Sequence, residues 1–169
     1  MKVVINASPF IYLGKKRKTG LLRLVFEKIF VPVEVEKEIM KLYDSPEAVQ
    51  LRDAIREGWV EVEQPSEHKK RQIAKLFSEI DEGEAAVIAL ALEGCEENVV
   101  IDDAEARIAA EYFELKVHGT LYIILEAYKR NILRSKAKVM SMVNNMLKKG
   151  FYLSSEVYAQ LLFLLDKLR

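Results

Sequence analysis

Residues 99–107 read VVIDDAEAR, and the order of residue types in this stretch indicates how the whole chain folds. The run from Val99 to Ile101 is β-branched, as is typical of a buried strand, and two adjacent carboxylates separate it from a helix-like segment. Acidic residues in this place often cap the next helix, and Asp102 stands three residues before Glu105 as in a capping box. The alternative is that Asp102 and Asp103 belong to a metal site at the carboxyl end of a parallel sheet, where open α/β sheets bind ligands.

The rest of the chain alternates strand-like and helix-like segments. The other strand-like runs are Val3–Ile5, Ile29–Val31, Val60–Val62 and Lys116–His118. This alternation predicts an α/β fold with a mainly parallel sheet flanked by helices. After His118 the pattern is helical to the end, with Gly150 as a stop and Ser154 as a restart. We therefore expect one domain over residues 1–169, with a motif-bearing core over 1–130 and a C-terminal helical extension over 131–169.

Composition excludes several classes of protein. The 169 residues carry 26 basic and 26 acidic side chains, the balance of an ordinary globular protein. A single cysteine, Cys95, excludes an intramolecular disulfide and a cysteine-rich zinc site, and it fits a reducing cytoplasm. No apolar run approaches the roughly 18 residues that a membrane span requires. We expect a cytoplasmic protein with no membrane contact.

The charges that cancel over the whole chain do not cancel locally. Residues 1–30 carry seven basic and one acidic side chain, residues 79–114 carry one basic and twelve acidic, and residues 115–150 carry eight basic and one acidic. An acidic centre with basic surroundings suits a metal-dependent enzyme that acts on a polyanion. The same blocks also occur as solvated helix faces that pair with one another.

Four segments place polar or acidic groups where strands end or helices begin: VVINASP with Asn6 and Ser8, VPVEVEKEI with Glu34, Glu36 and Glu38, DEGEAAVIALALE with Asp81, Glu82 and Glu84, and VVIDD with Asp102 and Asp103. Each has an ordinary structural explanation. Asp81 and Glu84 can form a capping box, Glu34 and Glu38 can lie on an exposed helix face, and Asn6 can bond its own turn. Their combination at compatible places favours a shared site, and crowded carboxylates there predict at least one raised pKa.

The order of these motifs resembles a PIN domain, the nuclease fold of VapC-like toxins. It is most similar to a branch of small prokaryotic proteins with an Asn-x-Ser-Pro signature, which stands here at residues 6–9. The resemblance covers residues 1 to about 130 in motif order. It implies a parallel sheet and an acidic pocket that binds Mg²⁺ or Mn²⁺ and hydrolyses RNA phosphodiester bonds.

The resemblance also assigns roles to residues. The four acidic positions of the family fall on Asn6, Glu38, Glu84 and Asp103, with Asp102 beside the last. Of these, Asn6, Glu84, Asp102 and Asp103 are the implied metal ligands. Ser8 matches the hydroxyl residue near the first acid, and Thr120 falls near the hydroxyl position after the last strand, so both are expected to bind substrate. Asn6 is the departure, because most PIN nucleases have aspartate there.

Expected partners follow from the same features. The basic cluster Lys15, Lys16, Arg17 and Lys18 follows the first strand, and we expect it to contact the backbone of single-stranded RNA. The resemblance implies a homodimer and a small antitoxin partner. The alternative is a catalytically weak or inactive PIN-like module that binds RNA or a protein through the same cleft.

Overall fold

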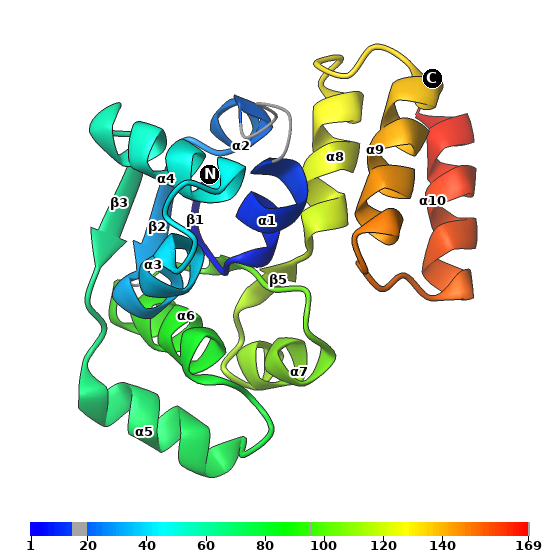
Figure 1. The fold of residues 1–169 in the computed structure, drawn as a ribbon. Coiled ribbons are helices and arrows are strands. Elements are labelled where there is room, and N and C mark those ends of the chain that lie inside the picture. The colour runs from blue at the N-terminus through cyan, green and yellow to red at the C-terminus, as the bar shows by residue number, and fades with distance from the viewer. Residues whose placement is uncertain (15–19, 95, 169) are drawn as a thin grey trace. The chain divides into compact units, whose positions relative to one another are not determined.

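The computed structural model describes residues 1–14, 20–94 and 96–168, and its strands form one parallel sheet in the order β3-β2-β1-β4-β5 (Figure 1). The strands are β1 (Lys2–Ile5), β2 (Lys28–Pro32), β3 (Val60–Glu63), β4 (Asn98–Val100) and β5 (Lys116–His118). Each contains a run that the sequence predicts to be a strand, apart from Ile101, which lies just beyond β4. The predicted α/β class with a parallel sheet is confirmed.

Helices connect and follow the strands: α1 (Ser8–Gly14), α2 (Gly20–Val25), α3 (Val33–Met40), α4 (Pro46–Arg56), α5 (Glu67–Leu76), α6 (Glu82–Gly94), α7 (Ala104–Tyr112), α8 (Thr120–Lys129), α9 (Lys136–Lys148) and α10 (Ser155–Lys167). Ser45, Ser66 and Ser154 cap α4, α5 and α10, each accepting a hydrogen bond from the amide three residues ahead. Gly150 follows α9 with φ +88°, a conformation that glycine adopts without strain. The start and stop signals of the sequence therefore act locally, as predicted.

The strand order places helices on both faces of the sheet. The chain runs from β1 to β3 in one direction and then returns past β1 to β4 and β5. Since parallel crossovers are right-handed, the helices that connect β1 to β3 cover one face, and α5, α6 and α7, which connect β3 to β5, cover the other. The contacts of α4 with β3, of α6 with β1, β2 and β4, and of α7 with β5 agree with this arrangement. The reversal puts a topological switch point between β1 and β4, where open α/β sheets bind ligands.

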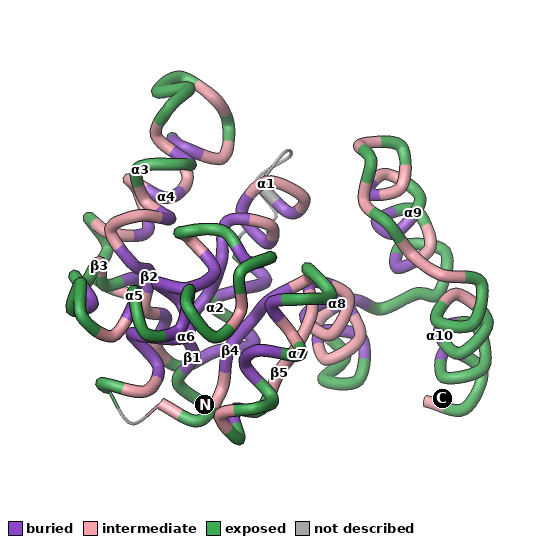
Figure 2. Tube along the Cα trace, turned by 90° about the horizontal axis from the view of Figure 1, so that it is seen from below, coloured by how far each residue is buried: buried purple, intermediate pink, exposed green. Residues whose placement is uncertain are grey.

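The core lies around the central strands and α6, which Figure 2 draws as buried. Every residue of α6 from Glu84 to Ala91 is buried. Because this helix is apolar on almost all sides, it can pack against the sheet and against α5 and α7 at the same time. Glu84 is the single charged residue in that buried run, so its position needs a separate explanation.

The chain divides into two compact units, residues 1–120 and 121–169. In the second unit, α10 buries Leu161 and Leu165 and leaves Leu162, Phe163 and Leu164 exposed, so its apolar surface is only partly covered. Among the described helices, none has the length and apolarity needed to cross a membrane. The division into compact units falls before residue 130, and the assignment of residues 1–169 to one domain stays a prediction.

Candidate functional site

The carboxyl ends of β1 and β4 bring the first and last polar motifs together. Ile5 pairs with Val100 in the sheet, and the Asn6 amide donates to the Val100 carbonyl at 3.1 Å. Asp102 and Asp103 follow two and three residues after Val100. The expectation that these two strand ends are neighbours is confirmed, although the residues are nearly a hundred positions apart in the chain.

Asn6 shapes the turn from β1 into α1. Its side chain is buried, and Oδ1 accepts a hydrogen bond from the Ala7 amide at 2.8 Å. This is the turn-bonding role that asparagine often takes. Ser8, two residues on, begins α1 and is half-buried. Asn6 therefore lies at the predicted place, but its side-chain oxygen already has a structural hydrogen bond.

Asp103, and not Asp102, caps the helix after β4. Oδ1 of Asp103 accepts from the amides of Glu105 and Ala106 at 2.9 and 3.0 Å. The capping-box alternative for Asp102 and Glu105 is therefore wrong by one position. A cap uses one carboxylate oxygen of Asp103, so the cap and a further ligand are compatible.

Asp102 is bound to Thr120 instead. Oδ1 accepts from the Thr120 amide at 2.8 Å, and Oδ2 accepts from the Thr120 hydroxyl at 2.6 Å. Burial raises the pKa of Asp102, and these hydrogen bonds and the charge of Arg107 oppose the rise. Thr120 is fully buried, and its expected contact with substrate stays a prediction. Thr120 holds Asp102 in place through these two hydrogen bonds.

Asp81 and Glu84 form the capping box that the sequence allows at the start of α6. The Asp81 amide donates to Glu84 Oε2 at 2.9 Å, and the Glu84 amide donates to Asp81 Oδ1 at 2.8 Å. Glu84 is buried, and its pKa is raised to about 7. Burial is the largest cause, and the negative charges of Asp81, Asp103 and Glu38 add to it, whereas the hydrogen bond from Asp81 opposes it. Carboxylates from three segments therefore act on Glu84.

Glu38 reaches this group from α3. A β-carbon built on Gly83 would meet Asp81 Oδ1 at 3.3 Å and Glu38 Oε2 at 3.6 Å, so both carboxylates lie against the glycine. Burial and the charge of Asp81 raise the pKa of Glu38, and the charge of Lys41 opposes the rise. The absent side chain at Gly83 lets the last turn of α3 approach the first turn of α6.

A pocket of about 420 Å³ opens beside these groups. Its lining residues are Glu34, Lys37, Glu38, Lys41, Asp81, Glu82 and Gly83. Behind it, the buried ammonium of Lys70 pairs with Glu34, with Glu67 at 2.6 Å and with Glu82 at 3.8 Å. Lys70 therefore links α5 to α3 and to the start of α6, the two elements that carry Glu38 and Glu84.

Comparison with known proteins agrees with this architecture. The model of a PIN-domain family, DUF3368, matches residues 2–167. The chain belongs to the PIN-domain family. PIN domains are generally nucleases, and they typically bind Mg²⁺. No curated protein of known function matches the chain. The match extends over both compact units.

The donor set of this PIN domain suits a hard cation. Within the described residues, no three His, Cys, Asp or Glu side chains stand together closely enough to hold an ion in the conformation seen. The groups that gather around Glu84 are nevertheless all carboxylates, and Mg²⁺ prefers oxygen ligands and keeps several waters. Burial raises the pKa of Glu84, and the negative charges of Asp81, Asp103 and Glu38 add to that rise. The residues therefore fit the cation that the family typically binds.

The sequence did not single out three residues that support the PIN-domain site. Lys70 is buried and pairs with Glu34 of the pocket, and Arg107 Nη1 donates to the Ile101 carbonyl at 3.0 Å. Tyr12 lies near Asp102. Burial raises the pKa of Tyr12, and the charge of Asp102 adds to that rise. No local pattern marks Lys70, since α5 is rich in exposed basic residues. Arg107 is the one basic residue in the acidic block 79–114, which is a signal that could have drawn attention to it.

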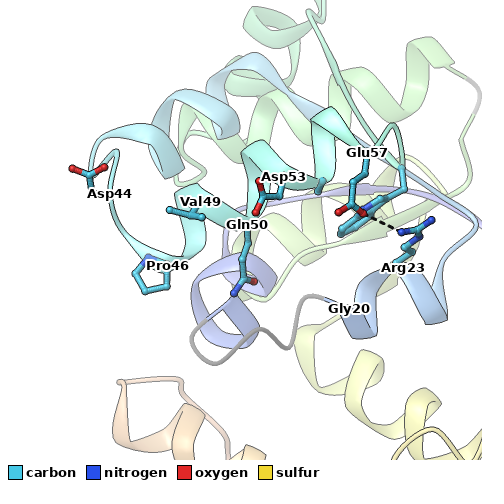
Figure 3. Close-up of a pocket in the computed structure, with 10 residues that line it drawn as sticks. Gly20, Arg23, Asp44, Pro46, Val49, Gln50, Asp53 and Glu57 are labelled. Carbon is cyan, nitrogen blue, oxygen red and sulfur yellow. Dashed lines mark hydrogen bonds and ion pairs between the residues drawn. The ribbon is translucent and has the colours of Figure 1, made fainter.

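Two further regions share no residue with the acidic group around Glu84. The basic cluster Lys15, Lys16, Arg17 and Lys18 lies outside the described residues. A second pocket, of about 570 Å³, is lined by Gly20, Arg23, Asp44, Pro46, Val49, Gln50, Asp53, Ala54, Glu57 and Trp59 (Figure 3). In it, Arg23 pairs with Glu57 at 3.0 Å and Trp59 donates to the same carboxylate, so these polar groups bind one another. None of the predicted site residues lines it.

Proposed function

We propose that this PIN domain is a ribonuclease that hydrolyses phosphodiester bonds of single-stranded RNA with Mg²⁺ or Mn²⁺. The observation that carries the proposal is the buried carboxyl of Glu84, whose pKa rises to about 7 among the charges of Asp81, Asp103 and Glu38. A bound cation stabilises the ionised form of such a carboxyl group, which burial and neighbouring negative charges otherwise disfavour. The same conclusion is supported by Asp103, whose charge acts on Glu84 and which follows β4 beside the switch point of the sheet.

The residues take different parts in this proposal. Glu84 and Asp103 would hold the ion, with Glu38 at the exposed edge of the same group. A bound divalent cation offsets charge on the phosphate and lowers the pKa of its water ligands. Asp102 and Thr120 keep the turn after β4 in place through their two hydrogen bonds, so we assign Asp102 a positioning role. Asn6 keeps the turn after β1 in place.

The test is cleavage of a fluorescently labelled single-stranded RNA by purified protein in Mg²⁺, in Mn²⁺ and in EDTA. We expect metal-dependent cleavage that is lost in Glu84→Gln and in Asp103→Asn. Glu111→Gln is the matched control, because Glu111 is an exposed glutamate on α7 and no predicted site residue. Cleavage that survives in both Glu84→Gln and Asp103→Asn would show that the reaction occurs elsewhere.

The neutral amide of Asn6 favours one alternative, a PIN domain that binds RNA or a protein with little or no hydrolysis. Asn6 stands where the family resemblance implies an acid, and its oxygen already bonds the Ala7 amide. A wild-type protein that binds RNA without cleaving it, together with an Asn6→Asp variant that cleaves, would establish this alternative.

We also propose the homodimer and the small antitoxin partner that the resemblance implies. Sedimentation of the purified protein at several concentrations tests the dimer. Co-purification with the product of an adjacent small reading frame, with loss of cleavage in the complex, tests the antitoxin. A protein that is monomeric at all concentrations, with no such neighbouring frame, would instead favour a nuclease that acts alone.

A further inference from the structure

Two lysines share a wall of the acidic pocket. Lys37 and Lys41 line it together with Glu34, Glu38 and the start of α6. Lys41 is the C-cap of α3 and keeps helical backbone angles, φ −53° and ψ −36°, so the two lysines stand four residues apart on one helical turn. Side chains with this spacing lie on the same face of a helix.

The charge of Lys41 acts on the nearby carboxylate of Glu38, but among the described residues neither lysine is held in a close ion pair. Both are exposed, and among the ion pairs of the described residues neither takes part in one. Lys70, by contrast, is buried and holds three glutamates behind the same pocket. The pocket therefore has one cation used for internal pairing and two that face solvent with their donors available.

The pocket offers both carboxylates and ammonium groups, and this combination suits a phosphodiester that is bound together with a divalent cation. Asp81 and Glu38 lie against Gly83, and Lys37 and Lys41 line the same pocket from α3. Carboxylates suit a divalent cation, and ammonium groups suit the phosphates that the cation does not neutralise. Four residues advance about 6 Å along a helix axis, and long, flexible lysine side chains can bring that separation to the spacing of neighbouring phosphates on one strand.

We propose that Lys37 and Lys41 bind successive phosphates of the RNA strand and lead it past Glu38 into the acidic group. This inference rests on the proposed ribonuclease function and names the substrate-binding part of that site. Lysine acts as a point charge on phosphate, without reading the base, so this contact is independent of RNA sequence. Lys37 and Lys41 are distinct from the basic cluster at residues 15–18, which the sequence predicts to contact RNA.

Binding is measured first, by fluorescence anisotropy of a labelled single-stranded RNA in EDTA, where no divalent cation supports cleavage. The proteins are wild type, Lys37→Ala/Lys41→Ala, Lys37→Arg/Lys41→Arg and the control Lys75→Ala, an exposed lysine on α5 outside the pocket. We expect the double alanine variant to bind about tenfold more weakly. The slope of log affinity against log salt should fall in magnitude by about 1.4, since each phosphate contact contributes about 0.7 on single strands.

The arginine variant should restore both values, and Lys75→Ala should match wild type. In Mg²⁺ or Mn²⁺ the double alanine variant should show a raised KM with a smaller change in kcat. Circular dichroism and the melting temperature of each variant show that folding is retained. If the lysines serve only to offset negative charge in the fold, the melting temperature changes while affinity and salt slope stay those of wild type, and the proposal is overturned.

The outcomes separate this proposal from the proposed function. Lysine-dependent binding of RNA by a wild-type protein that never cleaves would retain the lysine subsite and remove the ribonuclease. A second outcome is metal-dependent cleavage that Glu84→Gln abolishes, together with RNA affinity, salt slope and KM that Lys37→Ala/Lys41→Ala leaves unchanged. This outcome would support the ribonuclease and overturn the lysine subsite. A wild-type protein that does not bind RNA at all would overturn both.

Discussion

Glu84→Gln should make the metal-free protein more stable at alkaline pH. A glutamate in the unfolded chain ionises with a pKa near 4.5, whereas Glu84 in the folded protein has a pKa of about 7. Below pH 4.5 both states hold the proton, so the group contributes nothing to the pH dependence. Between these values the folded state holds the proton and the unfolded state does not, so the free energy of unfolding falls as pH rises.

The size of this loss follows from the two pKa values. The pKa of this carboxyl is near 4.5 in the unfolded chain and about 7 in the folded protein. At about 1.4 kcal/mol for each pH unit between these values, the free energy of unfolding is lower by about 3 kcal/mol above pH 7. Glutamine carries no such charge, and its side-chain oxygen can still accept from the Asp81 amide. The variant should therefore match wild type near pH 4.5 and exceed it by up to about 3 kcal/mol at pH 8.

Urea denaturation in EDTA at several pH values between 4.5 and 8.5 measures this difference. Comparing each variant with wild type at the same pH cancels the other titrating groups, and Glu111→Gln controls for loss of one surface charge. Added Mg²⁺ should reverse the order, because a ligand that binds the ionised folded state stabilises wild type and not Glu84→Gln. A stability difference between Glu84→Gln and wild type that stays constant across this pH range would refute the electrostatic account of the site.

Substitutions at three other positions test the neighbouring parts of the site. Asn6→Asp keeps the bond to the Ala7 amide and adds a charge, so calorimetry should show that Mg²⁺ binds about tenfold more tightly. Asn6→Ala should lose about 1 kcal/mol of stability together with activity. Equal Mg²⁺ affinity in wild type and Asn6→Asp would place Asn6 away from the ion. Gly83→Ala puts a β-carbon 3.3 Å from Asp81 Oδ1 and 3.6 Å from Glu38 Oε2, so cleavage should fall while the melting temperature changes little. Lys70→Met leaves the carboxylate of Glu34 buried without its ion pair and should lower the free energy of unfolding by about 3 kcal/mol. The double variant Lys70→Met/Glu34→Gln should largely restore that stability. If the double variant is no more stable than Lys70→Met, Lys70 acts through packing.

Local sequence signals were sufficient for the elements of this fold. A strand of β-branched residues, a serine before a helix and a glycine after one act on neighbouring backbone, so Val99 and Val100, Ser45, Ser66 and Gly150 behave as their local context predicts. The alternation of strands and helices then leaves a parallel sheet as the simplest arrangement. The capping box of Asp81 and Glu84 belongs to the same class, since both partners lie within one helical turn.

The ends of β1 and β4 show a longer-range feature that the pattern could still indicate. Strand-end residues in a parallel sheet gather at one edge, so polar groups after two strands are candidates for one site whatever their separation in the chain. The sequence could not separate the roles of Asp102 and Asp103, because adjacent residues with the same side chain have the same local preferences. The pairing of Asp102 with Thr120 depends on β5 lying beside β4, and it turns one aspartate inward and leaves the other at the helix start.

The local periodicity of the chain and its capping residues determined the helices, the strands and the edge of the sheet at which polar groups meet. Tertiary packing alone decided which of those groups are buried and which have a perturbed pKa. Glu84 has a raised pKa because α6 is buried on nearly all sides and because α3 and the turn after β4 bring Glu38 and Asp103 toward it. Lys70 is buried where α5 packs against α6 and pairs there with Glu34, whereas the neighbouring basic residue Arg71 stays exposed. Desolvation and long-range charge depend on three-dimensional surroundings, so neighbouring residues of similar type acquire different chemistry.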